Sequence, residues 1–200
     1  MVYVELGQHL EEARCRQSLG ELMRIKGDYA PAVEHLKAAQ QTHSSSNQSF
    51  DTAQCSESLG ILYLDQGNFD AATTELEASR SSFLALGDQF HLAQSTRFLG
   101  TVRCRQRDFT RAEELLREAE DISTAIADHF ALANCSWAFG DLRRDQGRLE
   151  EAFTYYESAQ HGFEVMGLVE EATQCKEGAG LMRSKKDRTS VSLSSLDVDY

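Results

Sequence analysis

Cysteine is the residue type best able to carry chemistry in this chain, and four of the five cysteines share one register. Cys15, Cys55, Cys135 and Cys175 are separated by multiples of 40 residues, and Ser95 occupies the same register. Side chains in such a register lie on successive helical units about 10 Å apart, whereas a disulfide needs Cα atoms within about 7 Å. No Cys-x2-Cys pair occurs. We therefore expect small buried core residues in a reducing compartment, and no metal site.

Other patterns that carry chemistry are absent from the sequence. The six histidines show no ligand spacing such as His-Glu-x2-His, and neither a phosphate-binding loop nor a Gly-x-Ser-x-Gly motif occurs. Acidic pairs such as Glu113-Glu114 and Glu150-Glu151 fall in expected first turns of helices, where the macrodipole favours carboxylates. The sequence therefore predicts no enzyme, no catalytic residues and no cofactor.

The charge balance argues against two classes of partner. The chain carries a formal net charge of −12, with a pI of about 4.9, whereas nucleic acids and anionic membranes both attract basic surfaces. No apolar run approaches the ~20 residues of a spanning helix, and the N-terminus lacks the pattern of a secretory signal. We expect a cytoplasmic protein that binds neither nucleic acid nor membrane.

Glycine reveals internal repeats with a period of 40 residues. Eleven of the thirteen glycines fall into three series with this interval. So regular a spacing is typical of a repeat architecture. The first series is Gly20, Gly60, Gly100, Gly140 and Gly180. The second is Gly27, Gly67 and Gly147, with Arg107 at the position between Gly67 and Gly147. The third is Gly7, Gly87 and Gly167, with Asn47 and Ala127 at the remaining positions.

Each unit of 40 residues has the apolar periodicity of two helices. The second glycine series lies between them and is expected to end the first helix in a left-handed conformation. Asp28, Asn68 and Asp108 follow as N-caps of the second helix. In the fourth unit the stripes are Cys135, Phe139, Leu142 and Gln146 in the first helix, and Leu149, Ala152, Phe153, Tyr156, Ala159, Phe163 and Met166 in the second.

The first glycine series, apart from Gly180, falls in the middle of first helices, where glycine costs about 1 kcal/mol relative to alanine. A gain elsewhere must offset this cost. We expect a close approach of the second helix that a Cβ atom would block. The small residues on the side of the second helix are predicted to be Ala32, Ala72, Ala112 and Ala152.

The repeated order of Leu-Gly, an aromatic residue and then Ala-x3-Leu resembles the tetratricopeptide repeat. The resemblance covers about residues 1–183 and is carried by Leu59-Gly60, Tyr63, Gly67, Phe69, Ala72, Leu76 and their counterparts. This is a 40-residue subclass, since the usual period is about 34. The resemblance implies an all-α fold, a right-handed α-solenoid of tandem helix–turn–helix repeats. It also implies a scaffold or adaptor for protein partners, or the sensor part of a signalling ATPase.

The repeat pattern also predicts where the units begin and end. Residues 1–8 align with the end of a preceding repeat helix, which indicates a piece of a longer array or a truncated product. A Ser-rich tail without periodicity is expected to be disordered. The predicted repeats are 9–48, 49–88, 89–128 and 129–168, followed by a capping or partial fifth repeat helix at 169–183 and the tail at 184–200.

If first helices line a concave groove, as the resemblance implies, the face turned away from their buried stripe meets the ligand. In the fourth unit this face holds the only tryptophan, Trp137, which is either a ligand anchor or a packing residue. Four arginines face three acids there, so we expect a nearly neutral groove. The predicted groove residues are Arg14, Gln17, Glu21, Gln54, Glu57, Ile61, Gln94, Arg97, Thr101, Asn134, Trp137, Asp141 and Arg144, with Arg24 and Leu64 on the same face.

Three functions are compatible with this organisation. The leading hypothesis is a scaffold whose concave groove binds a peptide or a partner domain. The second is end-to-end self-association, because repeat stacks with uncovered ends can stack on one another. The third is the sensor part of a larger signalling ATPase, although these residues contain no phosphate-binding loop.

Overall fold

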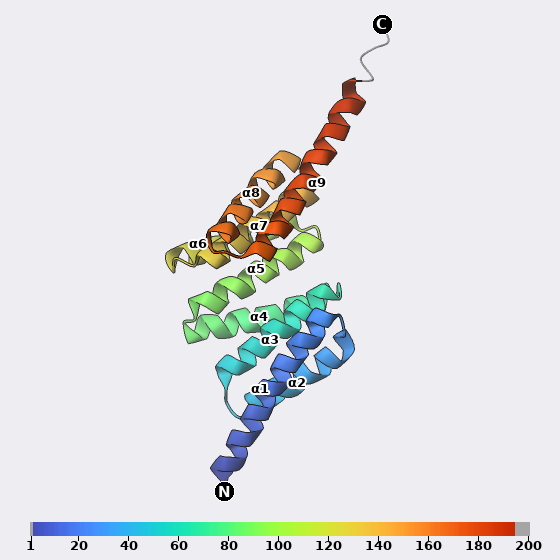
Figure 1. Cartoon of the computed structure of the whole chain (residues 1–200). Helices are drawn as coiled ribbons and strands as arrows, with labels where there is room; N and C mark the ends of the chain where they lie inside the picture. The colour runs from blue at the N-terminus through green and yellow to red at the C-terminus, as the bar shows by residue number, and fades with distance from the viewer. Residues whose placement is uncertain (1, 195–200) are drawn as a thin grey trace.

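The computed structural model describes the backbone of residues 2–194 and the side chains of residues 7–182. Helices pair into antiparallel hairpins, and the hairpins stack into an elongated array with the termini at opposite ends (Figure 1). Within the described residues there is no strand. The helices are α1 (Val2–Lys26), α2 (Tyr29–Ser45), α3 (Ser49–Asp65), α4 (Phe69–Leu86), α5 (Gln89–Arg105), α6 (Phe109–Ala125), α7 (His129–Asp145), α8 (Leu149–Val165) and α9 (Val169–Ser194).

The turn inside each hairpin is built on a left-handed residue, as the second glycine series predicts. Gly67 has φ +73° between α3 and α4, a conformation that costs glycine little because it has no Cβ. Arg107, the exception in the sequence, adopts the same conformation with φ +63°. The turns between successive hairpins also contain a left-handed residue, for example Gly87 and Ala127.

The three predicted residues all occupy N-cap positions. Asn68 and Asp108 each accept a hydrogen bond from the backbone N–H three residues later, at 3.3 and 3.2 Å. Asp28 is the N-cap residue of α2, but its side chain makes no capping hydrogen bond. Asp88 and Asp128, which were not predicted, cap α5 and α7 with their side chains.

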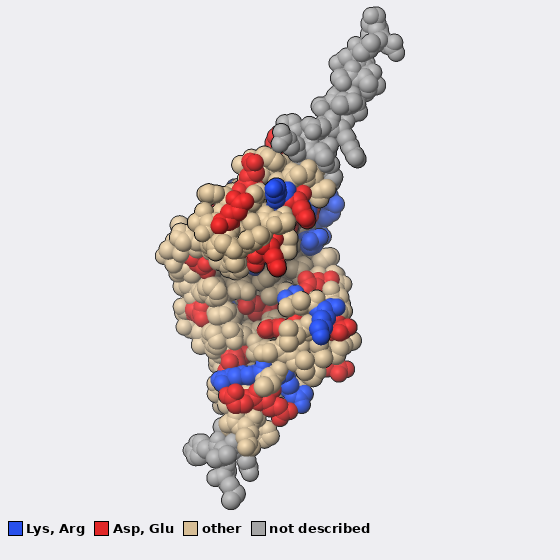
Figure 2. Space-filling view, viewed as in Figure 1, with Lys and Arg blue, Asp and Glu red and all other residues tan. Residues whose placement is uncertain are grey.

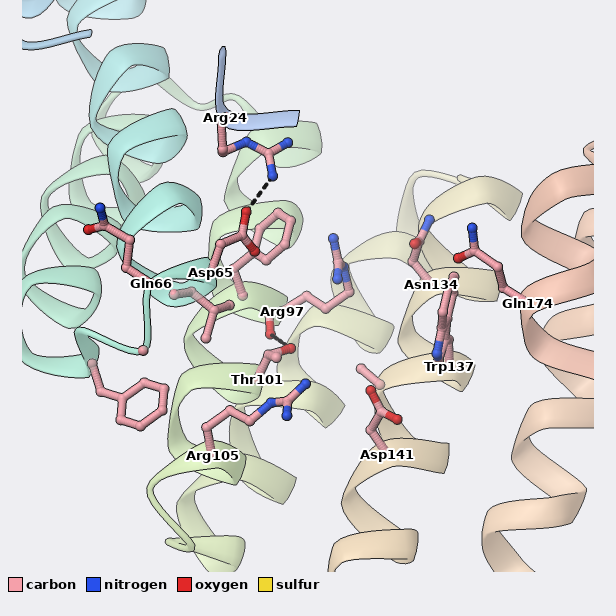
Figure 3. Close-up of a pocket in the computed structure, with 15 residues that line it drawn as sticks. Arg24, Asp65, Gln66, Arg97, Thr101, Arg105, Asn134, Trp137, Asp141 and Gln174 are labelled. Carbon is pink, nitrogen blue, oxygen red and sulfur yellow. Dashed lines mark hydrogen bonds and ion pairs between the residues drawn. The ribbon is translucent and has the colours of Figure 1, made fainter. Parts of the chain in front are cut away.

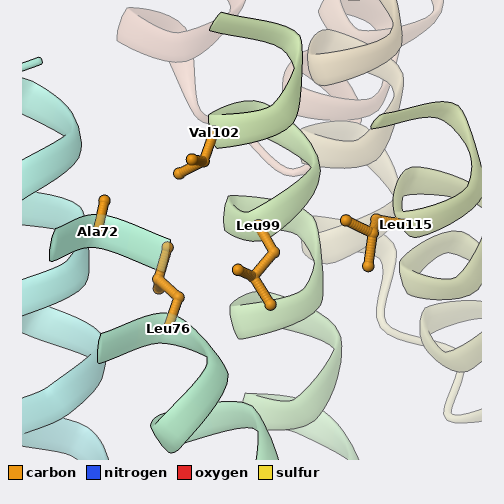
Figure 4. Packing of buried hydrophobic residues seen from close by; sticks show 5 residues of the cluster. All are labelled: Ala72, Leu76, Leu99, Val102 and Leu115. Carbon is orange, nitrogen blue, oxygen red and sulfur yellow. The ribbon is translucent and has the colours of Figure 1, made fainter. Parts of the chain in front are cut away.

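The core is a series of small apolar clusters, each of which joins side chains from two or three successive helices. Figure 4 shows the cluster in which Ala72 and Leu76 of α4 meet Leu99 and Val102 of α5 and Leu115 of α6. Each of these side chains is buried. Because every cluster joins neighbouring elements only, the array forms an extended solenoid and not a single compact core.

The close approach predicted at the mid-helix glycines is confirmed. A Cβ built on Gly60 would lie 2.5 Å from Leu76 Cγ, a distance that real Cβ atoms do not tolerate. The neighbour is thus the large residue four positions after the predicted alanine. The corresponding nearest distances are 2.7 Å from Gly20 to Leu36, 2.9 Å from Gly100 to Leu116 and 2.8 Å from Gly140 to Tyr156.

The first predicted boundary is not a helix boundary in the structure. Residues 1–8 are predicted to end a preceding repeat helix, with the first repeat beginning at residue 9, but α1 runs from Val2 to Lys26 without a break.

Helix α9 also extends beyond the predicted boundary at residue 183. It reaches Ser194, where the sequence predicts a disordered tail, while residues 195–200 lie outside the described residues. No glycine or proline occurs between residues 184 and 194 to end the helix.

The cysteines of the 40-residue register differ in burial between α1 and the later helices. Cys55, Cys135 and Cys175 are buried as predicted, whereas Cys15 is exposed, so the prediction of a buried residue is wrong at this position. Leu22 is likewise 57% exposed, although Leu62 in the same register is fully buried. Within the described chain no other helix covers this side of α1, so its outward face remains in solvent.

Candidate functional site

A groove of about 900 Å³ runs along the first helices of the hairpins. We call this space the inner groove. Figure 3 shows side chains from α1, α3, α5, α7 and α9 converging on it. Its lining consists of Arg24, Leu64, Asp65, Gln66, Gly67, Phe69, Arg97, Phe98, Thr101, Arg105, Asn134, Trp137, Ala138, Asp141 and Gln174.

The acidic side chains of the inner groove are each neutralised within the protein. Arg24 of α1 donates to Asp65 of α3 at 2.6 Å, and the dashed line in Figure 3 marks this bond. Asp141 accepts a hydrogen bond from the Tyr156 hydroxyl at 2.7 Å and forms an ion pair with Arg144. Neither carboxylate is therefore left to attract a basic ligand by itself.

Two arginines of the groove have no carboxylate partner among the described residues. Arg97 and Arg105 lie two turns apart on α5, with Thr101 between them on the same face. The Arg97 guanidinium carbon lies 4.1 Å from the centroid of the Phe98 ring. Burial lowers the pKa of Arg97, yet a guanidinium stays charged at neutral pH. Glu57 acts on Arg97 electrostatically but forms no ion pair with it. The groove thus presents two guanidinium groups that form no ion pair within the described part of the chain.

Trp137 packs against a neighbouring aromatic ring and also lines the inner groove. The side chain is thus both a packing residue and part of the groove surface. Its ring meets Phe163 edge-on, with centroids 6.2 Å apart and planes at 80°. The remaining part of the half-buried side chain lines the inner groove beside Asn134 (Figure 3). Truncation would consequently remove packing as well as contact surface.

Seven residues of the predicted face come together in this space. Arg24 comes from α1 and Leu64 from α3. The other five lie on α5 and α7, and they are Arg97, Thr101, Asn134, Trp137 and Asp141.

Four predicted residues are engaged in internal contacts. Glu21 accepts a hydrogen bond from Ser58 at 2.8 Å, and Gln54 contacts the His91 ring at 3.4 Å. Glu57 is only 6% exposed and accepts a hydrogen bond from Ser95 at 2.7 Å. Burial raises the pKa of Glu57. Together with Arg144, these residues stabilise the array rather than line the groove.

The remaining four predicted residues lie outside the inner groove. Arg14 is exposed and forms an ion pair with Glu11 on the same helix, at 2.9 Å. Gln17 and Ile61 are half-buried on α1 and α3. Gln94 lines a smaller cavity between α5 and α7 that adjoins the groove.

Eight residues of the groove lining were missed by the prediction from sequence, among them the polar residues Asp65, Arg105 and Gln174. Asp65 and Arg105 occupy one register, four residues after Ile61 and Thr101 respectively. Continuing the predicted face by one more turn would have found them. Gln174 of α9 was missed because the fifth first-helix was left out of the face.

Acidic side chains outnumber basic ones in the chain as a whole. In the view of Figure 2, acidic side chains are spread along the array, with fewer basic ones between them, which agrees with the net charge of −12. No group of three His, Cys, Asp or Glu side chains within the described chain is placed to hold a metal ion. None of the helices described is apolar and long enough to cross a membrane.

Comparison with known proteins gives a family match and a set of shared folds. Residues 91–161 match the family model described as tetratricopeptide repeat. No curated protein matches the chain in sequence. A Rap protein complexed with Competence and Sporulation Factor has a TM-score of 0.82 at 13% identity, over 93% of this chain and 52% of that chain.

Two further structures share the fold. The Rap conjugation gene regulator of plasmid pLS20, in complex with the Phr* peptide, has a TM-score of 0.68 at 17% identity, over 86% of this chain and 53% of that one. A signal transduction ATPase with a tetratricopeptide repeat sensor, from Pyrococcus horikoshii, has a TM-score of 0.71 at 12% identity, over 96% and 31% of the two chains.

The chain spans about half the length of the Rap chains that it matches. At these identities the likeness shows the fold alone. The resemblance to the tetratricopeptide repeat family is thereby confirmed: residues 91–161 carry the family's pattern, and the whole array has a tetratricopeptide-like solenoid fold.

Proposed function

We propose that this chain is a non-catalytic scaffold that binds an extended segment of a protein partner in the inner groove. The observation that carries the proposal is the pair of unpaired arginines, Arg97 and Arg105, on the groove face of α5. Guanidinium groups that line a groove without an ion-pair partner favour an acidic ligand, because they can form charge-assisted hydrogen bonds with carboxylates.

The shape and composition of the groove support the same proposal. Trp137 offers an aromatic surface, and Asn134 and Gln174 offer amide groups that can bond to a peptide backbone. Such a mixture of an aromatic anchor with dispersed polar groups is typical of peptide-binding surfaces. The Rap structures named above were solved with a factor or a peptide bound, which makes a peptide ligand a reasonable expectation for this fold.

The experiment is affinity capture from a reducing cell extract, comparing the wild type with two charge-reversal variants. Arg97→Glu changes the inner groove, whereas Arg117→Glu makes the same change on the outer helix α6, where the arginine side chain is 64% exposed. We expect a partner that is retained by the wild type and by Arg117→Glu and is lost by Arg97→Glu. Equal retention by all three proteins would contradict groove binding.

Trp137 needs its own variant because it also packs on Phe163. Trp137→Phe keeps most of the aromatic packing and shortens the surface presented to the groove. We expect the same partner to be retained less well by a variant whose thermal unfolding midpoint is close to that of the wild type. Unchanged retention would assign Trp137 to packing.

Self-association is a second candidate, favoured by the uncovered face of α1. Leu19, Leu22 and Ile25 are 40%, 57% and 72% exposed, at a spacing that places them along one side of the helix. A second copy could cover them. Sedimentation velocity over a range of concentrations tests this, with Leu22→Glu as the variant that should abolish any dimer. A concentration-independent monomer would refute self-association.

A further inference from the structure

A small cavity opens between α5 and α7 beside the inner groove. Its volume is about 40 Å³, and its walls include Phe90 and Phe130, which are 47% and 46% exposed. Arg97 and Asn134 line both this cavity and the inner groove, so the two spaces meet at these residues. We call the cavity the α5–α7 slot.

The equivalent place between α3 and α5 is filled by a side chain. The His91 ring stacks on Phe83, with centroids 4.6 Å apart, and meets Phe50 and Phe90 edge-on at 5.2 and 5.0 Å. His91 is held there by Asp88, which lies 3.0 Å from its Nδ1. Aromatic packing thus closes the space between these two first helices.

Forty residues later, both filling residues are small. Ala131 stands in the register of His91, and Ser123 stands in the register of Phe83. The other residues in the register of Ser123 are His43 and Phe163, and both are fully buried. The slot therefore exists because α6 and α7 lack the imidazole and phenyl groups that fill the same place elsewhere.

The slot is apolar except at its edges. The Ser123 hydroxyl donates to the Ala119 carbonyl at 2.7 Å, so this donor needs no hydrogen-bond acceptor from a ligand. At the edge, Asp128 Oδ2 is buried and has no hydrogen-bond partner among the described residues, while Oδ1 caps α7. This oxygen can accept an N–H from a bound backbone. At the groove end the slot opens towards the Arg97 guanidinium.

Charge again distinguishes this junction from the preceding one. The residue equivalent to Arg97 at the α3–α5 junction is Glu57, 40 positions earlier. Its buried carboxylate accepts a hydrogen bond from the Ser95 hydroxyl. Only at the α5–α7 junction does an open slot adjoin a guanidinium without a carboxylate partner in the described chain. An apolar side chain and an acidic one can therefore be held there together.

We infer that the α5–α7 slot takes one aliphatic side chain of a bound partner segment, while Arg97 takes the carboxylate of an acidic residue two positions away. The inference rests on the proposed groove function and names the ligand class for it. The two-residue spacing follows because alternate side chains of an extended chain point to the same side. Such a residue would also cover the exposed rings of Phe90 and Phe130.

The probe for the test is a capped Gly/Ser peptide with a central Asp-Ser-Leu. Two matched peptides carry Lys in place of Asp, or Ser in place of Leu. Binding to the full chain is followed by amide chemical shifts in nuclear magnetic resonance and by the fluorescence of Trp137, the only tryptophan. We expect each change in the peptide to weaken binding by at least about tenfold.

The slot can be closed with the residue type that fills the equivalent place at the preceding junction, where His91 lies. Ala131→His introduces the residue that fills the preceding junction, and it should weaken binding of the Asp-Ser-Leu peptide by at least about tenfold. Ser123→Phe closes the slot from α6, and so keeps the test valid if the first variant does not fold. Arg97→Glu should reverse the preference, so that the Lys peptide binds better than the Asp peptide.

The outcomes separate the slot from the groove. Loss of binding in a folded slot variant, with reversal in Arg97→Glu, supports the inference. Peptide-induced shifts at Trp137 that are unchanged by Ala131→His and Ser123→Phe would overturn the slot and leave the proposed groove function standing. If none of the peptides shifts any groove residue at millimolar concentration, both the slot and acidic-peptide binding in the groove are refuted.

Discussion

Replacing Gly60 by alanine should destabilise the array, although alanine is the better helix former. The propensity gain is about 1 kcal/mol. Against it, the new Cβ would lie 2.5 Å from Leu76 Cγ and 2.8 Å from Leu76 Cδ2. Leu76 is fully buried within the core cluster of Figure 4 and has no free space to move into. Overpacking of this kind costs about 1–3 kcal/mol, so we expect a net loss of up to about 2 kcal/mol.

Gly180 provides a matched control in the same register. An added Cβ there meets no heavy atom within 4 Å, and the residue is exposed on α9. Gly180→Ala should therefore realise the propensity gain and stabilise its helix by up to about 1 kcal/mol.

Thermal unfolding followed by circular dichroism compares the two variants. At about 2–4 °C per kcal/mol for a chain of this size, Gly60→Ala should lower the midpoint by up to about 8 °C, while Gly180→Ala should not lower it. A Gly60→Ala protein that is more stable than the wild type, as Gly180→Ala is expected to be, would refute the close-approach explanation.

Two further predictions concern buried groups. His43 is fully buried, and burial lowers its pKa although nearby Asp51 opposes the shift. The unfolded chain then binds the proton more readily, so stability should fall as pH drops below about 6.5. Urea midpoints at about pH 7.5 and pH 5.5 should show His43→Phe losing less stability than the wild type; an equal loss would contradict this. Burial also raises the pKa of Cys55 to about 12, so alkylation at about pH 8 should modify exposed Cys15 well before Cys55, and mass spectrometry showing equal rates would contradict it.

The fold was predictable because its determinants are local and repeated. The first glycine series marks the close helix contacts, and the other two mark the turns. Because each pattern recurs every 40 residues, the repetition outweighs the weakness of any single position as a signal. Helix ends were less predictable. Gly7 has the residue type of a turn, but a glycine permits a left-handed conformation without requiring it. The helix therefore continues through it.

The candidate site was predictable only in part. Helical phase identified the face that holds Arg97, Asn134 and Trp137, because that face follows from the position of the buried stripe. It could not show that Glu57 would turn inward to Ser95, since this depends on a side-chain partner 38 residues away. Nor could it show the α5–α7 slot, which results from two small residues on different helices meeting in space.

The most direct test of the central claim is site-specific photocrosslinking of the captured partner. A photoreactive amino acid replaces Thr101, which lies in the inner groove between Arg97 and Arg105, or Glu157, which is exposed on the outer helix α8. Groove binding predicts a covalent adduct from position 101 and none from position 157. An adduct from position 157 alone would contradict it and place the partner on the outer surface.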